Sequence, residues 1–348
     1  MTLAAKVRKA VNAGKPARAL KLCRGVKSHA ALCSKDGGRE GLTPLLILCS
    51  ATKAGFSSSV RALLDSKADP DLSVRHGFTP LYMAAEANSC DCMLALIEAK
   101  ADLDIANTRD QATPLYRAVD VGHAEAVRVL LCAKADLTLT RHGGFQPLHR
   151  AAALGHPEVL ELLLSHKACV GTTTDLQATP LHSACSSTGD CVGRMDPACV
   201  AMLLAAKADV NAITGGEASS QDETPLICVV RTGADPSAAE CVRMLAAAKA
   251  DLNLAASNGL TPLVYAAKAQ LLGCIKALVR AGAATSAKVL GGRITTEAWM
   301  CDHFEACPSA HMTQIVKCFP KTRDFATQNP LSEVRGFTFH ILVVCERN

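Results

Sequence analysis

The feature that most constrains this chain is a pair of short sequence markers that recur in step with each other. A triplet, Thr-Pro-Leu six times and Gln-Pro-Leu once, begins at residues 43, 79, 113, 146, 179, 224 and 261. A second marker, Ala-Lys-Ala-Asp or a near copy, follows each triplet, and it does so after 21 residues in four of the seven units. Such phased self-similarity predicts copies of one supersecondary unit stacked side by side.

Each unit reads as two short helices. Thr before Pro provides an N-cap followed by the first helical position, where the missing N–H of proline costs nothing. From Pro147 the apolar residues recur at helical spacing as far as Gly155, and a second apolar helix runs over 159–164 and stops near Lys167. Because one such hairpin cannot bury both of its apolar faces, neighbouring copies must stack. This pattern predicts an all-α repeat solenoid.

The repeat strongly resembles the ankyrin repeat. Residues 146–151 (Gln-Pro-Leu-His-Arg-Ala) and 179–184 (Thr-Pro-Leu-His-Ser-Ala) are close to the Thr-Pro-Leu-His-x-Ala start of that family, and the Gly-His pairs at 122–123 and 155–156 match its helix–helix turn. The resemblance covers roughly residues 40–286. It implies a helix–turn–helix stack with short β-hairpin fingers and about seven clear repeats.

Three regions follow from where the markers begin and end. Residues 1–36 are expected to form a degenerate N-terminal capping repeat, since they hold two short apolar stripes with many lysines. Residues 37–286 form the repeat array. Residues 287–348 make a C-terminal tail of unknown structure, in which the repeat stops.

Lysine stands where the family has glycine after its second helix, a position that the family places in the left-handed conformation. The substituted residues are Lys67, Lys100, Lys134, Lys167, Lys207 and Lys249. A non-glycine residue there costs on the order of 1 kcal/mol, and a cation at a helix C-terminus offsets about 0.3–1 kcal/mol of this. We interpret the resulting row as a solvated edge, with a basic track for an acidic partner as the alternative.

Histidine occupies the family's first-helix position at His149 and His182 only. In the family this side chain hydrogen-bonds the capping threonine and the neighbouring backbone. The resemblance therefore implies a structural role for both histidines and argues against a catalytic one.

The positions that vary freely within the family predict a partner-binding surface on the concave face, formed by the finger tips and first helices. Mapped onto this chain, the candidates are Arg75, His76, Phe78, Glu86, Arg109, Asp110, Asp120, Val121, His142, Phe145 and Leu154. Phe78 and Phe145 are either exposed anchors for the partner or packing residues that order the adjoining finger. The basic neighbours favour a partner with acidic and apolar groups.

No sequence motif for catalysis is found: the chain has no Gly-rich phosphate loop, no GxSxG, no HExxH and no Cys-x-x-Cys. Cys301, His303, Cys307 and His311 are ligand types that suit zinc, but their spacing matches no site known to us. We therefore expect no enzymatic activity, no metal and no cofactor.

Composition points to the inside of a cell. A net charge of +5 is mild for a dedicated nucleic-acid binder. The N-terminal residues carry charges throughout without an apolar core, which argues against a secretory signal, so the 17 cysteines are expected to be reduced. No apolar run is long enough to span a membrane. We expect a monomeric protein in the cytoplasm, with the nucleus as the alternative.

The array favours a protein–protein interaction module or adaptor. A second hypothesis is a substrate-recognition subunit of a ubiquitin ligase, in which residues 287–348 recruit the ligase. No clear recruitment motif is found in that tail, and recovery of elongin or cullin proteins with the tail would distinguish the two.

Overall fold

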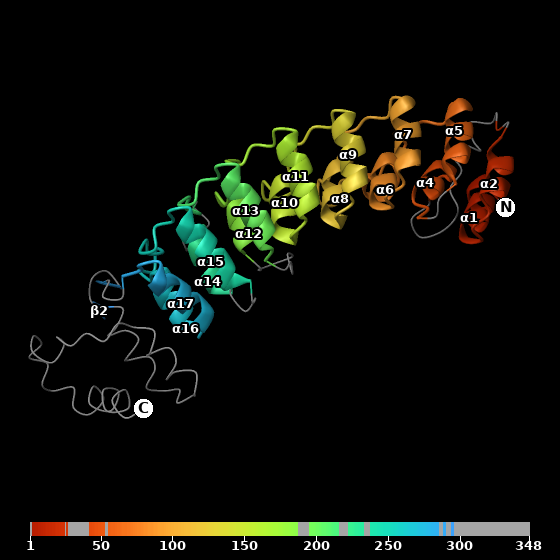
Figure 1. Ribbon diagram of the computed structural model, residues 1–348. Helices are drawn as coiled ribbons and strands as arrows, with labels where there is room; N and C mark the ends of the chain where they lie inside the picture. Colours follow the sequence, from red (N-terminus) through yellow and green to blue (C-terminus); the bar gives the residue numbers. More distant parts are fainter. Residues whose placement is uncertain are drawn as a thin grey trace, which may run out of the picture. The chain divides into compact units, whose positions relative to one another are not determined.

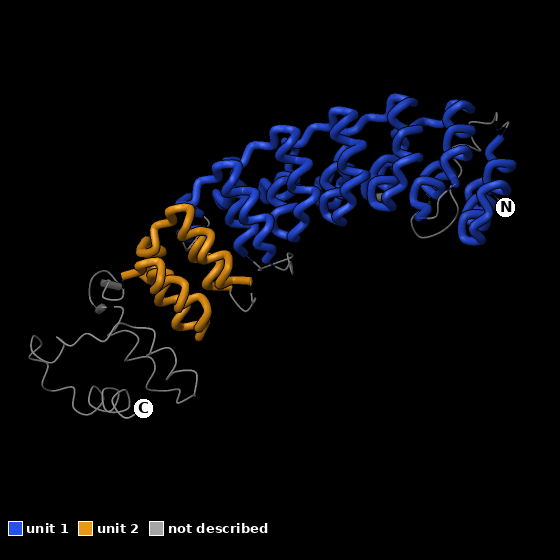
Figure 2. Tube along the Cα trace, viewed as in Figure 1, with its two compact units in different colours: residues 1–225 blue, residues 226–348 orange. Residues whose placement is uncertain are grey.

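A computed structural model describes residues 2–24, 26, 42–52, 55–186, 195–215, 222–232, 237–284, 288–289 and 294–295. Nearly all regular structure in these residues is helical. The chain divides into unit 1, residues 1–225, and unit 2, residues 226–348 (Figure 2).

Unit 1 is built from helix pairs, and we call the first helix of each pair inner and the second outer. The inner helices are α1 (Leu3–Asn12), α4 (Pro44–Cys49), α6 (Pro80–Glu86), α8 (Pro114–Val121), α10 (Pro147–Leu154) and α12 (Pro180–Cys185). The outer helices are α2 (Pro16–Cys23), α5 (Ser57–Asp65), α7 (Cys90–Glu98), α9 (Ala124–Cys132), α11 (Pro157–Ser165) and α13 (Pro197–Ala205). Within unit 1 the two kinds form separate rows, with the inner row on the inside of the curve (Figure 1).

Unit 2 continues with the same kind of pair. Its helices are α14 (Pro225–Thr232, whose first residue belongs to unit 1), α15 (Ala238–Ala247), α16 (Pro262–Lys268) and α17 (Leu272–Arg280). Two short antiparallel strands follow, β1 (Lys288–Val289) and β2 (Ile294–Thr295), in which Lys288 pairs with Thr295. The predicted all-α repeat solenoid is confirmed.

The helix starts follow the Thr-Pro signal. The hydroxyl of Thr79 accepts a hydrogen bond from the N–H of Tyr82 at 3.2 Å, and Thr113 does the same for Tyr116 at 3.2 Å. Each cap satisfies one of the amide groups that the first helical turn leaves without a partner, while the proline that follows needs none.

The outer helices end as the lysine row predicts. All six lysines adopt φ between 64° and 70°, the left-handed region. At Lys67 this turn lets its N–H donate to Leu64 O at 2.9 Å and lets the N–H of Ala68 donate to Leu63 O at 3.0 Å. These bonds satisfy carbonyls at the helix end, which offsets the conformational cost.

The core of unit 1 repeats with the helices. Inner helices contribute the leucine of the triplet, as at Leu81 and Leu115, and outer helices contribute a leucine four residues before the left-handed position, as at Leu96 and Leu130. All four side chains are fully buried. Each repeat therefore adds a similar layer to a continuous apolar core.

Neighbouring fingers of unit 1 are joined by backbone hydrogen bonds. The N–H of Thr108 donates to His76 O at 2.8 Å, and two fingers further along the N–H of Asp175 donates to Gly143 O at 3.1 Å. Within a finger, Arg141 and Phe145 form an antiparallel bridge, the one isolated β-bridge found in the described residues. These bonds hold the finger tips at fixed separations along unit 1.

Candidate functional site: the concave face of unit 1

The concave face of unit 1 carries an aromatic cluster where the fingers meet the inner helices. Tyr82 and Tyr116, with Ala112, form a buried group, and the half-buried Phe78 and Phe145 pack against it. The rings of Phe78 and Tyr82 lie 5.1 Å apart between centroids. Burial raises the pKa of both tyrosine hydroxyls to about 12. The cluster therefore remains uncharged at any physiological pH.

Both predicted phenylalanine anchors belong to this cluster. Phe78 and Phe145 each come just before an inner helix and lay one side of the ring on the tyrosines. Each leaves part of its side chain exposed. Packing against the tyrosines agrees with the interpretation that each ring helps to order its finger, whereas the role of Phe78 and Phe145 as anchors for a partner stays a prediction.

An ionic chain crosses the inner helices next to the aromatic cluster. Arg117 contacts Glu86 of the preceding repeat at 2.5 Å and Asp120 of its own helix at 2.7 Å. Asp120 in turn receives Arg150 of the following repeat, with 2.5 Å between Arg150 Nε and Asp120 Oδ1. The Arg150 side chain is only 12% exposed. The four charges alternate in sign, so they neutralise one another across three repeats.

Two predicted site residues, Glu86 and Asp120, are thus members of one network, which the sequence did not reveal. The arginines were not among the predicted residues. Their positions could have indicated the network. Arg117 and Arg150 are 33 residues apart at equivalent positions of adjacent repeats, and each lies within one helical turn of a candidate residue, Asp120 for Arg117 and Leu154 for Arg150.

The remaining predicted residues lie at the two edges of the face. Asp110 pairs with Arg141 of the next finger at 3.4 Å. The tips of these two fingers and of the preceding one present Arg109, His142 and His76, all exposed. Arg75 lies in the one-turn 3₁₀ helix η1 (Arg75–Gly77).

Val121 and Leu154 occupy the opposite edge, at the C-terminal ends of α8 and α10. Val121 is 39% exposed, and Leu154 is partly exposed. Since they occupy equivalent positions in adjacent repeats, they give this edge an apolar border.

The two consensus histidines stabilise the fingers. The N–H of Gln146 donates to His149 Nδ1 at 3.2 Å, which leaves Nε2 to donate to Ala178 O at 3.1 Å in the next finger. His182 repeats the arrangement, with Thr179 N–H donating to Nδ1 at 3.1 Å and Nε2 donating to Glu223 O at 3.0 Å. Burial lowers the pKa of each imidazole to about 4. The structural role expected from the family is confirmed.

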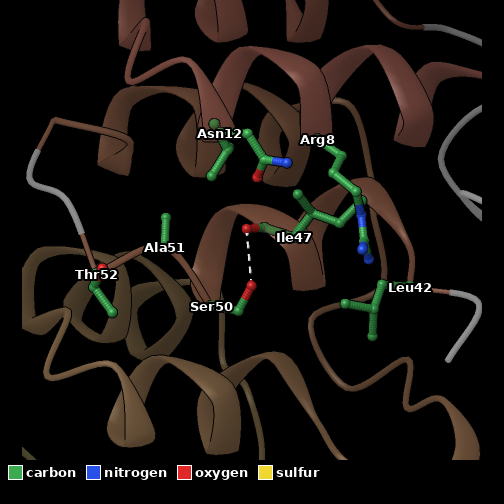
Figure 3. A pocket seen from close by; sticks show the side chains of 8 residues that line it. Arg8, Asn12, Leu42, Ile47, Ser50, Ala51 and Thr52 are labelled. Carbon is green, nitrogen blue, oxygen red and sulfur yellow. Dashed lines mark hydrogen bonds between the residues drawn. The ribbon is translucent and has the colours of Figure 1, made fainter. Parts of the chain in front are cut away.

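A polar hollow of about 330 Å³ lies between α1 and α4 (Figure 3). Arg8 and Asn12 reach into it from α1, and Ser50 lies on its floor. The Ser50 hydroxyl donates to Ile47 O at 3.1 Å. Among the described residues that line the hollow there is no carboxylate, imidazole or thiol.

The part of the chain that the structure describes contains no cluster of three metal-ligating side chains. The cysteine and histidine group at 301–311 lies outside the described residues. Nor does any described helix have the length and apolar content required to cross a bilayer.

Comparison with known proteins agrees with this geometry. A family model for ankyrin repeats (3 copies) matches residues 9–107, 46–141, 115–214 and 194–288, which together cover far more than half of the chain. The chain belongs to the ankyrin repeat family. Among solved structures, that of the human ASB11 ankyrin repeat domain is similar, with a TM-score of 0.57 and 24% sequence identity over 69% of this chain and 98% of that one. At this identity the likeness shows the fold alone. No curated protein sequence matches the chain.

As an ankyrin repeat protein, the chain carries the kind of array that generally serves protein–protein interaction. The residues that the sequence predicts as partner contacts lie on the concave face described above and at its edges. Which partner it takes is a separate question, because the fold does not fix it.

Proposed function

We propose that this ankyrin repeat protein is a non-enzymatic interaction module or adaptor that holds a partner protein on the concave face of unit 1. The observation that carries the proposal is the aromatic cluster of Phe78, Tyr82, Tyr116 and Phe145, because the two phenylalanines leave part of their side chains exposed beside polar and charged residues. Aromatic side chains with polar surroundings are the usual centres of binding energy in protein interfaces.

The charges of the face support a partner that is mainly apolar with some acidic groups. Glu86, Arg117, Asp120 and Arg150 already neutralise one another, so they offer little net charge to a partner. Arg109 forms no ion pair within the described part of the chain and lies at the exposed tip of its finger. It provides a cation at the edge of the cluster, where a carboxylate would add specificity and speed of association more than affinity.

The test compares captured partners of the full-length chain and two variants. The site variant carries Arg109→Glu and His142→Glu, which change exposed tip residues and leave the packed rings in place. The control carries Arg128→Glu, an exposed residue of the outer helix α9. Affinity capture from cell extract is followed by quantitative mass spectrometry, and thermal unfolding verifies that all three proteins are equally folded.

We expect a set of proteins that the wild type and the Arg128→Glu control retain and the site variant loses. A second variant, Phe78→Ala/Phe145→Ala, should lose the same set, since it removes the apolar centre. If the site variant and the phenylalanine variant keep every partner of the wild type, the concave face is not the binding surface.

The role of residues 287–348 in recruiting a ubiquitin ligase remains a prediction, because most of that segment lies outside the described residues. The same capture experiment addresses it, since elongin or cullin proteins would be retained by all variants of the concave face.

A further inference from the structure

A second surface that differs from the rest of the array lies on the outer helices of unit 2. Between α15 and α17, which pack against each other, the structure has a hollow of about 490 Å³. Its lining combines small residues, among them Ala246, Gly273 and Ala277, with the cations Arg243, Lys276 and Arg280. We call the three small residues the floor, and the exposed Lys276 and Arg280 the rim. Both helices belong to unit 2, drawn in orange in Figure 2.

The hollow exists because one repeat lacks a side chain that the others have. Three residues before the left-handed position, the other outer helices carry a branched aliphatic residue: Leu64, Ile97, Leu131, Leu164, Leu204 and Val279. In α15 the equivalent residue is Ala246. Its methyl group leaves unfilled the volume that a leucine would occupy against the next helix.

The same repeat pair has also lost a negative charge. Six residues before the left-handed position, a basic residue recurs in several outer helices, and it is paired with a carboxylate. Arg128 pairs with Glu125 at 3.5 Å, and Arg243 pairs with Glu240. In both pairs the acid lies three residues before the arginine on the same helix.

In α17 this position is Lys276, and the acid three residues before it is replaced by Gly273. Lys276 therefore has no ion pair in the part of the chain that the structure describes, and the same holds for Arg280 one turn later. The Cβ that a side chain at 273 would add lies 3.2 Å from Ala239 Cβ, so the backbone of α17 comes close to α15 at this end. The result is a groove with a methyl-lined floor and two uncompensated cations on its rim.

We propose that this groove binds an acidic amphipathic helix of a partner protein. Small side chains on the floor let the apolar face of another helix approach closely, as in helix-in-groove recognition. Lys276 and Arg280 are four residues apart and so lie on one face of α17, where they match two carboxylates spaced by one turn on the incoming helix. A nucleic acid fits less well, since the described residues of the lining include no aromatic side chain on which bases could stack.

A synthetic peptide tests the proposal on the full-length chain. The probe is a fluorescently labelled amphipathic helix with leucines on one face and glutamates one turn apart along the border of that face, and binding is measured by fluorescence anisotropy. We expect saturable binding that weakens as salt is added, because the rim contributes through exposed charges. A matched peptide with glutamine in place of glutamate should bind roughly fivefold more weakly, because it loses two exposed ion pairs.

Two variants separate the floor from the rim. Ala246→Leu restores the side chain that the other repeats carry, so it should fold as well as the wild type while filling the hollow. Lys276→Glu/Arg280→Glu reverses the rim charges. We expect each to weaken peptide binding by roughly tenfold or more, with circular dichroism unchanged. Arg128→Glu, the same charge change on a different outer helix, should leave peptide binding at the wild-type level.

Absence of saturable binding by the wild type overturns the proposal, and so does equal binding by Ala246→Leu and the wild type. If residues 296–348 of the chain itself filled the groove, the wild type would show no saturable peptide binding, and the proposal would be overturned. The variant Arg109→Glu/His142→Glu, which tests the concave face, should keep full peptide binding. The two proposals can therefore fail independently.

Discussion

The buried histidines make the stability of unit 1 depend on pH in a way that can be calculated. His149 and His182 are neutral in the folded state, because Nδ1 accepts a backbone N–H and Nε2 donates to the next finger. Burial lowers the pKa of each from 6.5 to about 4. Protonation of either ring would place two donors against each other at Nδ1.

The sign follows from which state binds the proton more tightly. Since the folded pKa lies below the unfolded one, the unfolded chain takes up protons first as the pH falls through 6.5. The stabilisation is complete above 6.5 and is lost progressively down to about 4. At a pH of about 5 the difference amounts to about 2 kcal/mol for each histidine, which is a large part of the stability of an ordinary domain.

Urea unfolding followed by circular dichroism at a pH of about 7.5 and about 5 measures this loss. The control variant is His149→Leu/His182→Leu, which carries at both positions the residue found at the equivalent Leu46. It should be less stable than the wild type near neutrality, because each substitution leaves a buried N–H and C=O without a partner. Its stability should then fall by about 4 kcal/mol less than that of the wild type between the two pH values.

Equal losses in the wild type and the leucine variant would refute this reasoning. His156, whose pKa burial also lowers, is retained in both proteins and contributes equally to each. The single variant His182→Leu separates the two histidines. The stability that it loses between the two pH values, beyond the loss of the double variant, is the contribution of His149.

Three further predictions concern the fingers, the ionic chain and the lysine row. Gly144 has φ of +75°, and a Cβ there would lie 2.6 Å from Asp175 Oδ1 and 2.9 Å from Asp175 N. Gly144→Ala should therefore lower thermal stability by about 2–3 kcal/mol. The control Gly171→Ala, whose Cβ would have no atom of the described residues beyond its chain neighbours within 4 Å, should change it by less than about 0.5 kcal/mol. Asp120→Ala removes the partner of Arg150, which is only 12% exposed, and should cost about 2 kcal/mol in chemical unfolding. The control Glu161→Ala, on the exposed face of α11, should cost little. Equal effects of the two substitutions would contradict the role of the network. Lys100 has φ of 66°, so Lys100→Gly should change the stability by less than about 1 kcal/mol, because relief of the backbone strain and loss of the charge nearly cancel. Lys100→Val should cost about 1–2 kcal/mol. Differential scanning calorimetry measures both, and a valine variant more stable than the glycine variant would disprove the backbone argument.

Much of the local structure of this protein could be predicted from its sequence. The phase of the Thr-Pro-Leu triplet with the Ala-Lys-Ala-Asp marker predicted the helix pairs, and the lysine at the glycine position predicted a left-handed turn that all six lysines adopt. These features depend on a few adjacent residues. Caps, turns and helical periodicity are set by the nearest neighbours in the chain, so they can be recognised without any tertiary contact.

Side-chain pairing between repeats could not be predicted in the same way. Whether Asp120 faces a partner or two arginines depends on how far one inner helix is displaced along its neighbour, and this displacement is set by packing. Likewise, Phe78 and Phe145 were recognised as candidates, but their contact with Tyr82 and Tyr116 depends on where the fingers fold back over the inner helices.

Sequence alone therefore determined the repeating unit of this protein, its number of recognisable copies and the positions at which each helix starts and stops. Tertiary structure decided which charges are neutralised, which aromatic surface stays exposed and where a missing leucine at Ala246 leaves a groove. The physical reason is that backbone conformation responds to local steric and hydrogen-bonding preferences, whereas the surface offered to a partner depends on the distances between residues of different repeats.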